Sequence, residues 1–304
     1  MKRTLALVLA ILLLSSALAE LDIVCSIFPQ YDFARRIAGE YASVTQLLPA
    51  GMDSHEYEPS PREVLACDRA DLFIYTDDEM EPWLSSIKGS LENVTLVRCA
   101  DSIDLVALNE EWEKMSGEEE EEHEHEGHHH SYDAHIWLDP TLAMVMCENI
   151  ASALCEKDPE HADTYKENCA ALVSELNALD EKYTALFAAH PGCTLYFGGK
   201  FAYSHFLRHY NVAFVTAYSD CSDEGEPGMR VILEIVREIS SASAKVIFTD
   251  EMSSGEVAEA IAEEAGCEVL LFHSCHNLTK KEEGLSYLEL MDRNYDNIAR
   301  ALGE

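Results

Sequence analysis

Short apolar runs rich in β-branched residues alternate along the chain with longer segments of helical periodicity. In the first half, the apolar runs predict strands at Ile23–Phe28, Val44–Leu48, Leu72–Tyr75, Thr95–Arg98 and His135–Leu138. Helices are predicted between them, for example at Tyr31–Gly39 and Pro61–Ala70. Because strands that alternate with helices tend to pair in parallel, this half of the chain predicts an α/β lobe.

One long helix is predicted after this lobe. Asp158 and Pro159 form a helix start, with the aspartate as N-cap and the proline at the first helical position. Helical periodicity continues to about Ala189, and the sequence His-Pro-Gly at 190–192 ends it. A helix of this length is far longer than the average and could cross a whole domain.

The alternation of strands and helices restarts after the long helix. Strands are predicted at Cys193–Phe197, Val212–Ala217, Lys245–Thr249 and Glu268–Phe272. Helices are predicted at Met229–Ile239, Gly255–Ala265 and Ser286–Ala301. The expected fold class is therefore α/β, with two lobes built on parallel sheets and joined by one long backbone helix. The expected parts are a first lobe over 20–157, a linking helix over 158–190 and a second lobe over 191–304.

The first residues have the pattern of a secretion signal. Lys2 and Arg3 precede the apolar run Leu5–Leu14, which is short for a membrane span, and a small-x-small sequence ends at Ala19. We expect a signal peptide over 1–19 and a periplasmic or extracytoplasmic protein, with an uncleaved anchor as the alternative. Cys25 lacks the preceding small residues of a lipidation sequence, so no lipid anchor is expected.

The charge of the chain narrows the choice of partners. It has 57 acidic against 21 basic residues and a formal net charge of −36. Nucleic acid binding needs a basic surface and anionic membranes repel an acidic one, so neither partner is expected. Cations are the small partners that such a field attracts.

Ten cysteines in a chain expected to be exported indicate disulfide bonds. The candidate pairs are Cys155–Cys169, which flank a predicted turn between helices, and Cys221–Cys275, which lie in two predicted loops. Buried free thiols are the alternative for several of them, because cysteine also behaves as a small apolar residue.

Histidine and glutamate are concentrated in one segment without apolar residues. Residues 117–130 contain seven glutamates and five of the thirteen histidines, namely His123, His125, His128, His129 and His130. Such a segment cannot bury a core and predicts a mobile loop. Imidazoles mixed with carboxylates indicate a weak collector of divalent transition metals, and a solvated acidic linker is the alternative.

Several isolated histidines lie at the ends of predicted strands. His55 follows a strand in a turn stiffened by prolines, and His135 comes soon after the histidine-rich segment. His273 and His276 both follow the last predicted strand. Loops at the carboxyl ends of strands are where α/β proteins place ligands. Asp139, by contrast, is expected to cap the next helix.

A further pair, His205 and His209, is spaced four residues apart and would share one face of a helix. That spacing could hold a metal ion, but it also occurs without function.

Taken together, these segments resemble the solute-binding proteins of metal-import ABC transporters, and in particular the zinc branch represented by ZnuA and AdcA. The resemblance covers nearly the whole chain after the predicted signal. It rests on Ile27-Phe-Pro, Gly-x-x-x-His-x-Tyr-Glu-Pro-Ser-Pro at 51–61, the acidic histidine-rich loop, His-Ile-Trp-Leu-Asp-Pro at 135–140, Glu226-Pro227 and Ser286-Tyr287.

The resemblance implies a monomer, not an enzyme, that captures one Zn²⁺ between its lobes and delivers it to the permease of an ABC transporter. The first two ligands of the family pattern fall on His55 and His135. The third falls on Lys200, which cannot ligate while protonated, so His205 is expected to replace it. The fourth falls in the segment after the last strand, where His276 is expected and His273 is the rival.

Alternatives remain within and outside this family. Imidazole ligands favour zinc, but Mn²⁺ or another divalent transition metal could be carried in the same role. An extracellular adhesin or metal buffer without a transporter is a second alternative. A secreted zinc hydrolase is a third, and it would need an open coordination position beside a general base.

Overall fold

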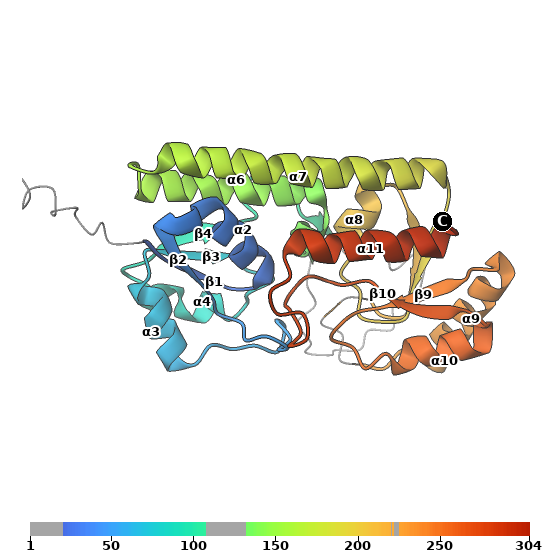
Figure 1. The fold of residues 1–304 in the computed structure, drawn as a ribbon. Coiled ribbons are helices and arrows are strands. Elements are labelled where there is room, and N and C mark those ends of the chain that lie inside the picture. Colours follow the sequence, from blue (N-terminus) through green and yellow to red (C-terminus); the bar gives the residue numbers. More distant parts are fainter. Residues whose placement is uncertain (1–20, 108–131, 220, 222–224) are drawn as a thin grey trace, which may run out of the picture.

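Two α/β lobes lie end to end beneath a pair of long helices (Figure 1). The structure is a computed structural model that describes residues 21–107, 132–219, 221 and 225–304. Each lobe contains a four-stranded sheet in which all strands run parallel. The prediction of two lobes with parallel sheets is therefore confirmed.

The sheet of the first lobe has the spatial order β2-β1-β3-β4. Its strands are β1 (Leu21–Cys25), β2 (Ala42–Gln46), β3 (Leu72–Tyr75) and β4 (Thr95–Arg98). Its helices are α2 (Phe28–Ala38), α3 (Pro61–Arg69), α4 (Leu84–Ile87) and α6 (Pro140–Lys157), with short 3-10 turns η1 (Gly39–Tyr41), η2 (Lys88–Ser90) and η3 (Ile136–Leu138). A short antiparallel pair joins β5 (Val106–Ala107) to β6 (Tyr132–Asp133).

The sheet of the second lobe has the order β10-β9-β7-β8. Its strands are β7 (Thr194–Phe197), β8 (Ala213–Thr216), β9 (Val246–Thr249) and β10 (Glu268–Leu271). Its helices are α8 (Ser204–His209), α9 (Met229–Ala242), α10 (Glu256–Ala265) and α11 (Tyr287–Leu302). In both sheets the first strand pairs with the second on one side and the third on the other, so the two lobes share one topology.

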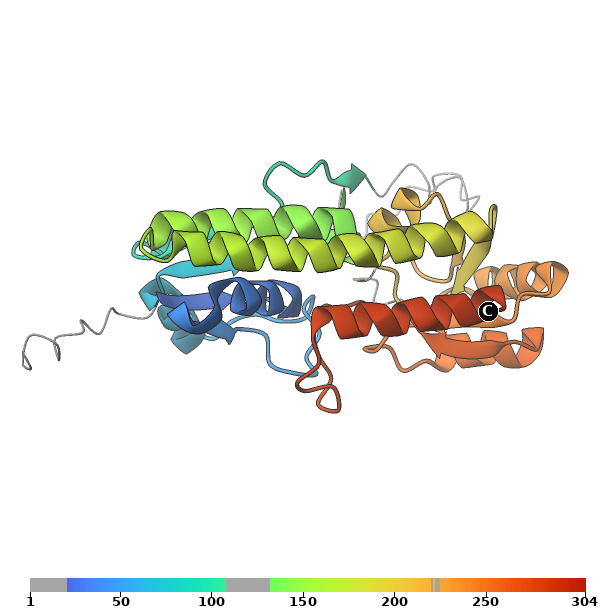
Figure 2. The ribbon, with the colours of Figure 1, turned by 45° about the horizontal axis from the view of Figure 1, so that its top comes forward.

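The long helix is α7 (Ala162–Ala189), with 28 residues. It packs beside α6 and continues past it along the second lobe (Figure 2). It begins three residues later than the sequence predicted, because Asp158 is the C-cap of α6 and His161 is the N-cap of α7. The Asp158 side chain instead accepts a hydrogen bond from Tyr165 Oη at 2.7 Å and lies 2.6 Å from His161 Nδ1.

Two predicted strands also differ from the structure. Ile23–Phe28 is too long, because Phe28 and the proline after it begin α2. His135–Leu138 is not a strand: residues 136–138 form the 3-10 turn η3 that leads into α6. The cap of α6 is the predicted one, since the Asp139 side chain accepts a hydrogen bond from Thr141 N at 2.8 Å.

One hydrophobic core extends through both lobes. Its buried members include Trp137 of the first lobe, Tyr203 of the second, and Tyr287 at the start of α11. Hydrogen bonds cross between the lobes as well: Phe28 N donates to His276 O at 3.1 Å, and the Trp137 indole donates to a second-lobe carbonyl at 2.8 Å. The segments that follow the strands are therefore fixed against one another. No helix in the described part of the chain is long and apolar enough to cross a membrane.

Candidate metal centre

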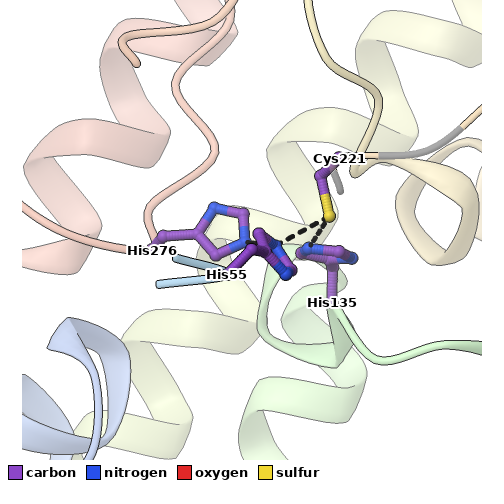
Figure 3. Close-up of side chains that lie close together, drawn as sticks. All are labelled: His55, His135, Cys221 and His276. Carbon is purple, nitrogen blue, oxygen red and sulfur yellow. Dashed lines mark hydrogen bonds between the residues drawn. The ribbon is translucent and has the colours of Figure 1, made fainter. Parts of the chain in front are cut away.

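Three histidines and one cysteine bring their ligand atoms together between the lobes (Figure 3). The group consists of His55, His135, Cys221 and His276, and one ligand atom from each lies within 4.8 Å of the others. His55 is half-buried and the other three side chains are buried. Within the described residues, no second group of three or more histidine, cysteine or acidic side chains meets the same criterion.

Each of the four side chains lies in a segment that follows a strand of one of the two sheets. His55 comes after β2, Cys221 after β8 and His276 after β10. His135 lies in the long connection after β4, two residues beyond the short strand β6 of the antiparallel pair. The group thus forms where the carboxyl ends of parallel strands from both lobes meet, the usual place for a ligand in α/β proteins.

The atoms that face one another are the Nε2 atoms and the cysteine sulfur. Cys221 Sγ lies 2.8 Å from His55 Nε2 and 2.9 Å from His135 Nε2. His55 Nε2 lies 3.3 Å from His276 Nε2. Bond lengths of about 2.0–2.1 Å for Zn–N and about 2.3 Å for Zn–S put tetrahedral nitrogens about 3.4 Å apart, and sulfur about 3.5 Å from nitrogen. The spacing between His55 Nε2 and His276 Nε2 fits a tetrahedral ion, whereas Cys221 Sγ would move outward from His55 and His135 by a fraction of an ångström.

His55 is positioned by a turn that begins at Asp53. Asp53 Oδ1 accepts a hydrogen bond from His55 N at 2.9 Å, and its Oδ2 lies 3.3 Å from Lys200 Nζ. Burial alone would lower the pKa of Lys200, but the ion pair with Asp53 raises it. Lys200, the position that the family pattern assigns to the third ligand, is therefore a cation that links the second lobe to the turn carrying His55.

His135 is held by a carboxylate. Asp133 Oδ1 lies 2.5 Å from His135 Nδ1 and also accepts the His135 backbone N–H at 2.9 Å. Burial would raise the pKa of Asp133, but its interactions with His135 outweigh that effect and lower it. An ionised carboxylate beside Nδ1 keeps a proton there, so the Nε2 lone pair points toward the group.

His276 is almost fully buried among the other members of the group. Its burial and the neighbouring His135 and His55 hold its pKa well below the usual value for histidine. Its Nδ1 lies 2.5 Å from Ser274 Oγ. The imidazole is therefore kept neutral, which is the form that binds a metal ion.

His205, expected to replace Lys200 as the third ligand, lies outside the group. Its Nε2 is 2.8 Å from the backbone carbonyl oxygen of Asp133, because the short helix α8 directs it into the contact between the lobes. The rival candidate His273 also lies outside: its Nε2 is 3.3 Å from a carboxylate oxygen of Glu282, and its Nδ1 accepts a hydrogen bond from Cys275 N at 2.9 Å.

Cys221 takes the place in the group that was expected of His205. The sequence had suggested Cys221 as a disulfide partner of Cys275, but none of the ten cysteines forms a disulfide bond in the structure. Cys275 Sγ lies 3.9 Å from the sulfur of a methionine in α11, whereas Cys221 Sγ faces the imidazoles. The predicted pair Cys155–Cys169 is not bonded either; each sulfur hydrogen-bonds to a backbone carbonyl.

Two expectations from the sequence fall outside the described residues. They are the signal peptide over 1–19 and the histidine-rich loop over 117–130.

Three imidazole nitrogens and the sulfur of Cys221, as a thiolate, would provide the four ligands of a closed tetrahedral site. Such a set suits zinc, while a calcium or manganese site would need more oxygen donors. The fold and the group together define a two-lobed α/β binding protein whose candidate ligands come from both lobes.

Comparison with known proteins agrees with this class. The family model described as zinc-uptake complex component A, periplasmic, matches residues 23–301. The chain belongs to this family.

Individual relatives show how far the similarity extends. The zinc-binding protein AdcA of Streptococcus pyogenes is 30% identical over 287 residues, which cover 92% of this chain and 55% of the relative. The chain thus spans about half the length of such relatives. The high-affinity zinc uptake system protein ZnuA of Bacillus subtilis is 29% identical, with 93% and 88% covered. The Zn(II)-bound ZnuA-like domain of Streptococcus pneumoniae AdcA shares the fold, with a TM-score of 0.77 at 23% identity over 94% of this chain and 100% of that domain.

Proposed function

We propose that this protein captures Zn²⁺ between its two lobes outside the cytoplasm and delivers the ion to the permease of an ABC transporter. The observation that carries the proposal is the convergence of three imidazole Nε2 atoms and one sulfur from both lobes. In this proposal the ligands are His55, His135, Cys221 and His276, and the ion is cargo and not a resident cofactor.

The chemistry of the group supports zinc as the cargo. A neutral His276 and a carboxylate-bound His135 present unprotonated nitrogens to the ion. Relatives over most of the chain are named as zinc-binding and zinc-uptake proteins. Mn²⁺ is the alternative cargo, but it would gain no carboxylate from the four members of the group.

The closed ligand set favours transport over catalysis. A zinc hydrolase keeps one coordination position open for water and places a general base beside it. Here four protein atoms already surround the centre of the group. The carboxylate of Asp133 contacts His135 at Nδ1, whereas Nε2 of the same ring faces the other members of the group. Asp133 is therefore on the side of the ring away from the ion and is not placed as a general base.

We further propose secretion by the signal peptide over 1–19, a monomeric protein and no lipid anchor. One relative, from Streptococcus pneumoniae, is named a zinc-binding lipoprotein, so the anchor is a point of difference worth testing. Mass spectrometry of the protein processed by a bacterial host should give an unmodified N-terminus at residue 20. A diacylated cysteine at the N-terminus would contradict this.

The test of the proposal is calorimetric titration of the metal-free, reduced protein with Zn²⁺ and with Mn²⁺. We expect one tight site for Zn²⁺ and much weaker binding of Mn²⁺. Tighter binding of Mn²⁺, or no tight binding of either ion, would reject zinc capture.

A pair of variants tests whether Cys221 or His205 completes the ligand set with the three histidines of the group. Cys221→Ala should weaken Zn²⁺ binding strongly, whereas His205→Ala should leave the affinity within a few fold of the wild type. Thermal unfolding of both metal-free variants controls for damage to the fold. The reverse order of affinities would return His205 to the ligand set and remove Cys221 from it.

A further inference from the structure

We propose that Glu251 is a positioning residue for His276 and that it acts through the hydroxyl group of Ser274. The inference rests on the proposed function, because His276 needs a defined tautomer only if it binds a metal ion. Glu251 lies in the segment after β9, and Ser274 and His276 lie in the segment after β10.

The three side chains form one buried line. Glu251 Oε2 accepts the backbone N–H of Ser274 at 2.8 Å, and Glu251 Oε1 lies 2.6 Å from Ser274 Oγ. Ser274 Oγ in turn lies 2.5 Å from His276 Nδ1. The Glu251 side chain is only 2% exposed, and Ser274 and His276 are buried.

The chemistry of these groups fixes the direction of the hydrogen bonds. An ionised carboxylate can only accept, so the single hydroxyl proton of Ser274 must point to Glu251. The oxygen of Ser274 is then left to accept the Nδ1–H of His276. Burial raises the pKa of Glu251, while the nearby imidazole of His273 and both hydrogen bonds from Ser274 act in the opposite direction and favour the ionised form. The result is an unprotonated Nε2 on His276, facing His55.

His135 shows the same arrangement in a more direct form. There the residue two positions earlier, Asp133, supplies the carboxylate to Nδ1 itself. Ser274 occupies the equivalent position two residues before His276 and contacts the same ring atom. Serine carries no charge. The carboxylate is therefore supplied by Glu251, which hydrogen-bonds to Ser274 and not to the imidazole itself. Outer partners of this kind change metal affinity by about 10- to 100-fold when they are removed.

Replacing the carboxylate by an amide should reverse the line of hydrogen bonds. In Glu251→Gln, the backbone N–H of Ser274 still needs an acceptor, so the amide oxygen turns toward it and the NH₂ group faces Ser274 Oγ. The hydroxyl must then donate to His276 Nδ1, which places the imidazole proton on Nε2. Ser274→Ala only removes the link and leaves both tautomers open. Glu251→Gln should therefore impair zinc binding more than Ser274→Ala does.

The experiment measures two quantities on the full, reduced chain. Zn²⁺ affinity, by competition with a chromophoric chelator, should fall about 10- to 100-fold in Glu251→Gln and less than about 10-fold in Ser274→Ala. The tautomer of His276, by nitrogen-15 NMR of the metal-free protein, should change from Nδ1–H to Nε2–H in Glu251→Gln. A merely structural role would lower the melting temperature without changing the tautomer.

Two further variants serve as controls. Ser274→Thr keeps a hydroxyl group and should bind Zn²⁺ nearly as well as the wild type. Glu175→Gln changes a carboxylate that pairs with Arg36 and contacts neither Glu251 nor Ser274, so it should leave both readouts unchanged.

The result that overturns the inference is an Nδ1–H tautomer of His276 in Glu251→Gln, or an affinity within twofold of the wild type. If Glu251→Gln fails to fold, Ser274→Ala is used in its place. A mixture of both His276 tautomers in that variant supports the inference, and a single Nδ1–H tautomer overturns it. The NMR readout needs no metal ion, so it can fail while zinc binding by the wild type succeeds. Absence of tight zinc binding by the wild type would instead reject the proposed function.

Discussion

The two lobes have the same sheet topology, and they contribute candidate ligands from equivalent segments. His55 follows the second strand of the first lobe, and Cys221 follows the second strand of the second lobe. His276 closely follows the fourth strand of the second lobe, and His135 lies in the longer connection after the fourth strand of the first lobe, beyond β5 and β6. The topology thus sets where ligands arise, while the residue at each place sets their chemistry.

The differences between the lobes lie in the donor atoms and their support. The first lobe offers two imidazoles, and the second offers one imidazole and one thiol. Asp133 contacts the first-lobe imidazole of His135 directly, whereas Ser274 stands between Glu251 and the second-lobe imidazole of His276. The second lobe therefore has the softer donor and the less direct outer carboxylate.

The largest effect is expected from removing either histidine that follows a fourth strand. A zinc site of four ligands is worth about 10–16 kcal/mol, so each ligand contributes roughly 3–4 kcal/mol, or about 100- to 1,000-fold in Kd. His135→Ala and His276→Ala should both lose this much in a chelator competition. His161→Ala, which changes a histidine that stacks on Tyr41 and lies outside the group, is the control. If His135→Ala and His276→Ala lost clearly different amounts of Zn²⁺ affinity, the two lobes would not contribute equally to the site.

The next effect concerns the soft donor of the second lobe. Cys221→Ser keeps the size of the side chain but replaces a thiolate, which soft ions prefer, by a hydroxyl. Zn²⁺ affinity should fall by about 10- to 100-fold, and Cd²⁺ affinity should fall further, so the Cd²⁺-to-Zn²⁺ preference decreases. Cys267→Ser, at a half-buried thiol outside the group, should change neither ion. An unchanged preference in Cys221→Ser would show that the sulfur does not bind the ion.

A smaller effect is expected from the ion pair that joins the lobes beside His55. Lys200→Met should weaken Zn²⁺ binding by less than about 10-fold, because a partly exposed pair contributes about 1 kcal/mol or less. Lys182→Met removes an ion pair with Asp292 on the outside of the molecule and should not affect binding. A higher Zn²⁺ affinity in Lys200→Met would mean that the charge of Lys200 repels the ion more than its ion pair with Asp53 helps to position His55.

The smallest expected effect is on the free energy of unfolding, and it comes from Glu282 in the second lobe. The hydrogen bond from His273 lowers the pKa of Glu282 to about 2, below its unfolded value near 4.5. Its contribution to folding is therefore fully present above about pH 5 and is lost as the pH falls from 4.5 toward 2. In urea titrations, Glu282→Gln should be less stable than the wild type at pH 7, and the gap should close in acid. A gap that widens in acid would contradict the lowered pKa.

Much of the fold could be predicted because apolar runs and helix caps are local properties of the sequence. All eight strands of the two sheets lie where such runs were found, and Asp139 caps α6 as expected. The apolar run after His135 was misassigned because a buried 3-10 turn and a buried strand give the same short pattern. The domain boundaries and the signal peptide stay predictions.

The candidate site was harder to predict, because its members depend on the path of each loop. A left-handed backbone conformation at Cys275 (φ 58°) separates the directions of His273 and His276, which the sequence alone could not distinguish. Cys221 was missed because a lone loop cysteine in a chain expected to be exported also suits a disulfide.

A usable signal was nevertheless present in the sequence. His55, His135 and His276 are the only three of the thirteen histidines with Asp or Ser two residues earlier. In the structure, each of these earlier side chains accepts the backbone N–H of its histidine. His205 is preceded at that position by a tyrosine. The local turn therefore marks the histidines that point into the group.

The continuous core has a thermodynamic consequence for the ion. Because buried side chains bind the lobes into one body, and the ion would tie both together, its binding energy should count toward the unfolding of the whole molecule in a single step. At a free ion concentration 1,000 times Kd, that linkage amounts to about 4 kcal/mol. Loading state and resistance to heat or proteolysis would then rise and fall together across both lobes.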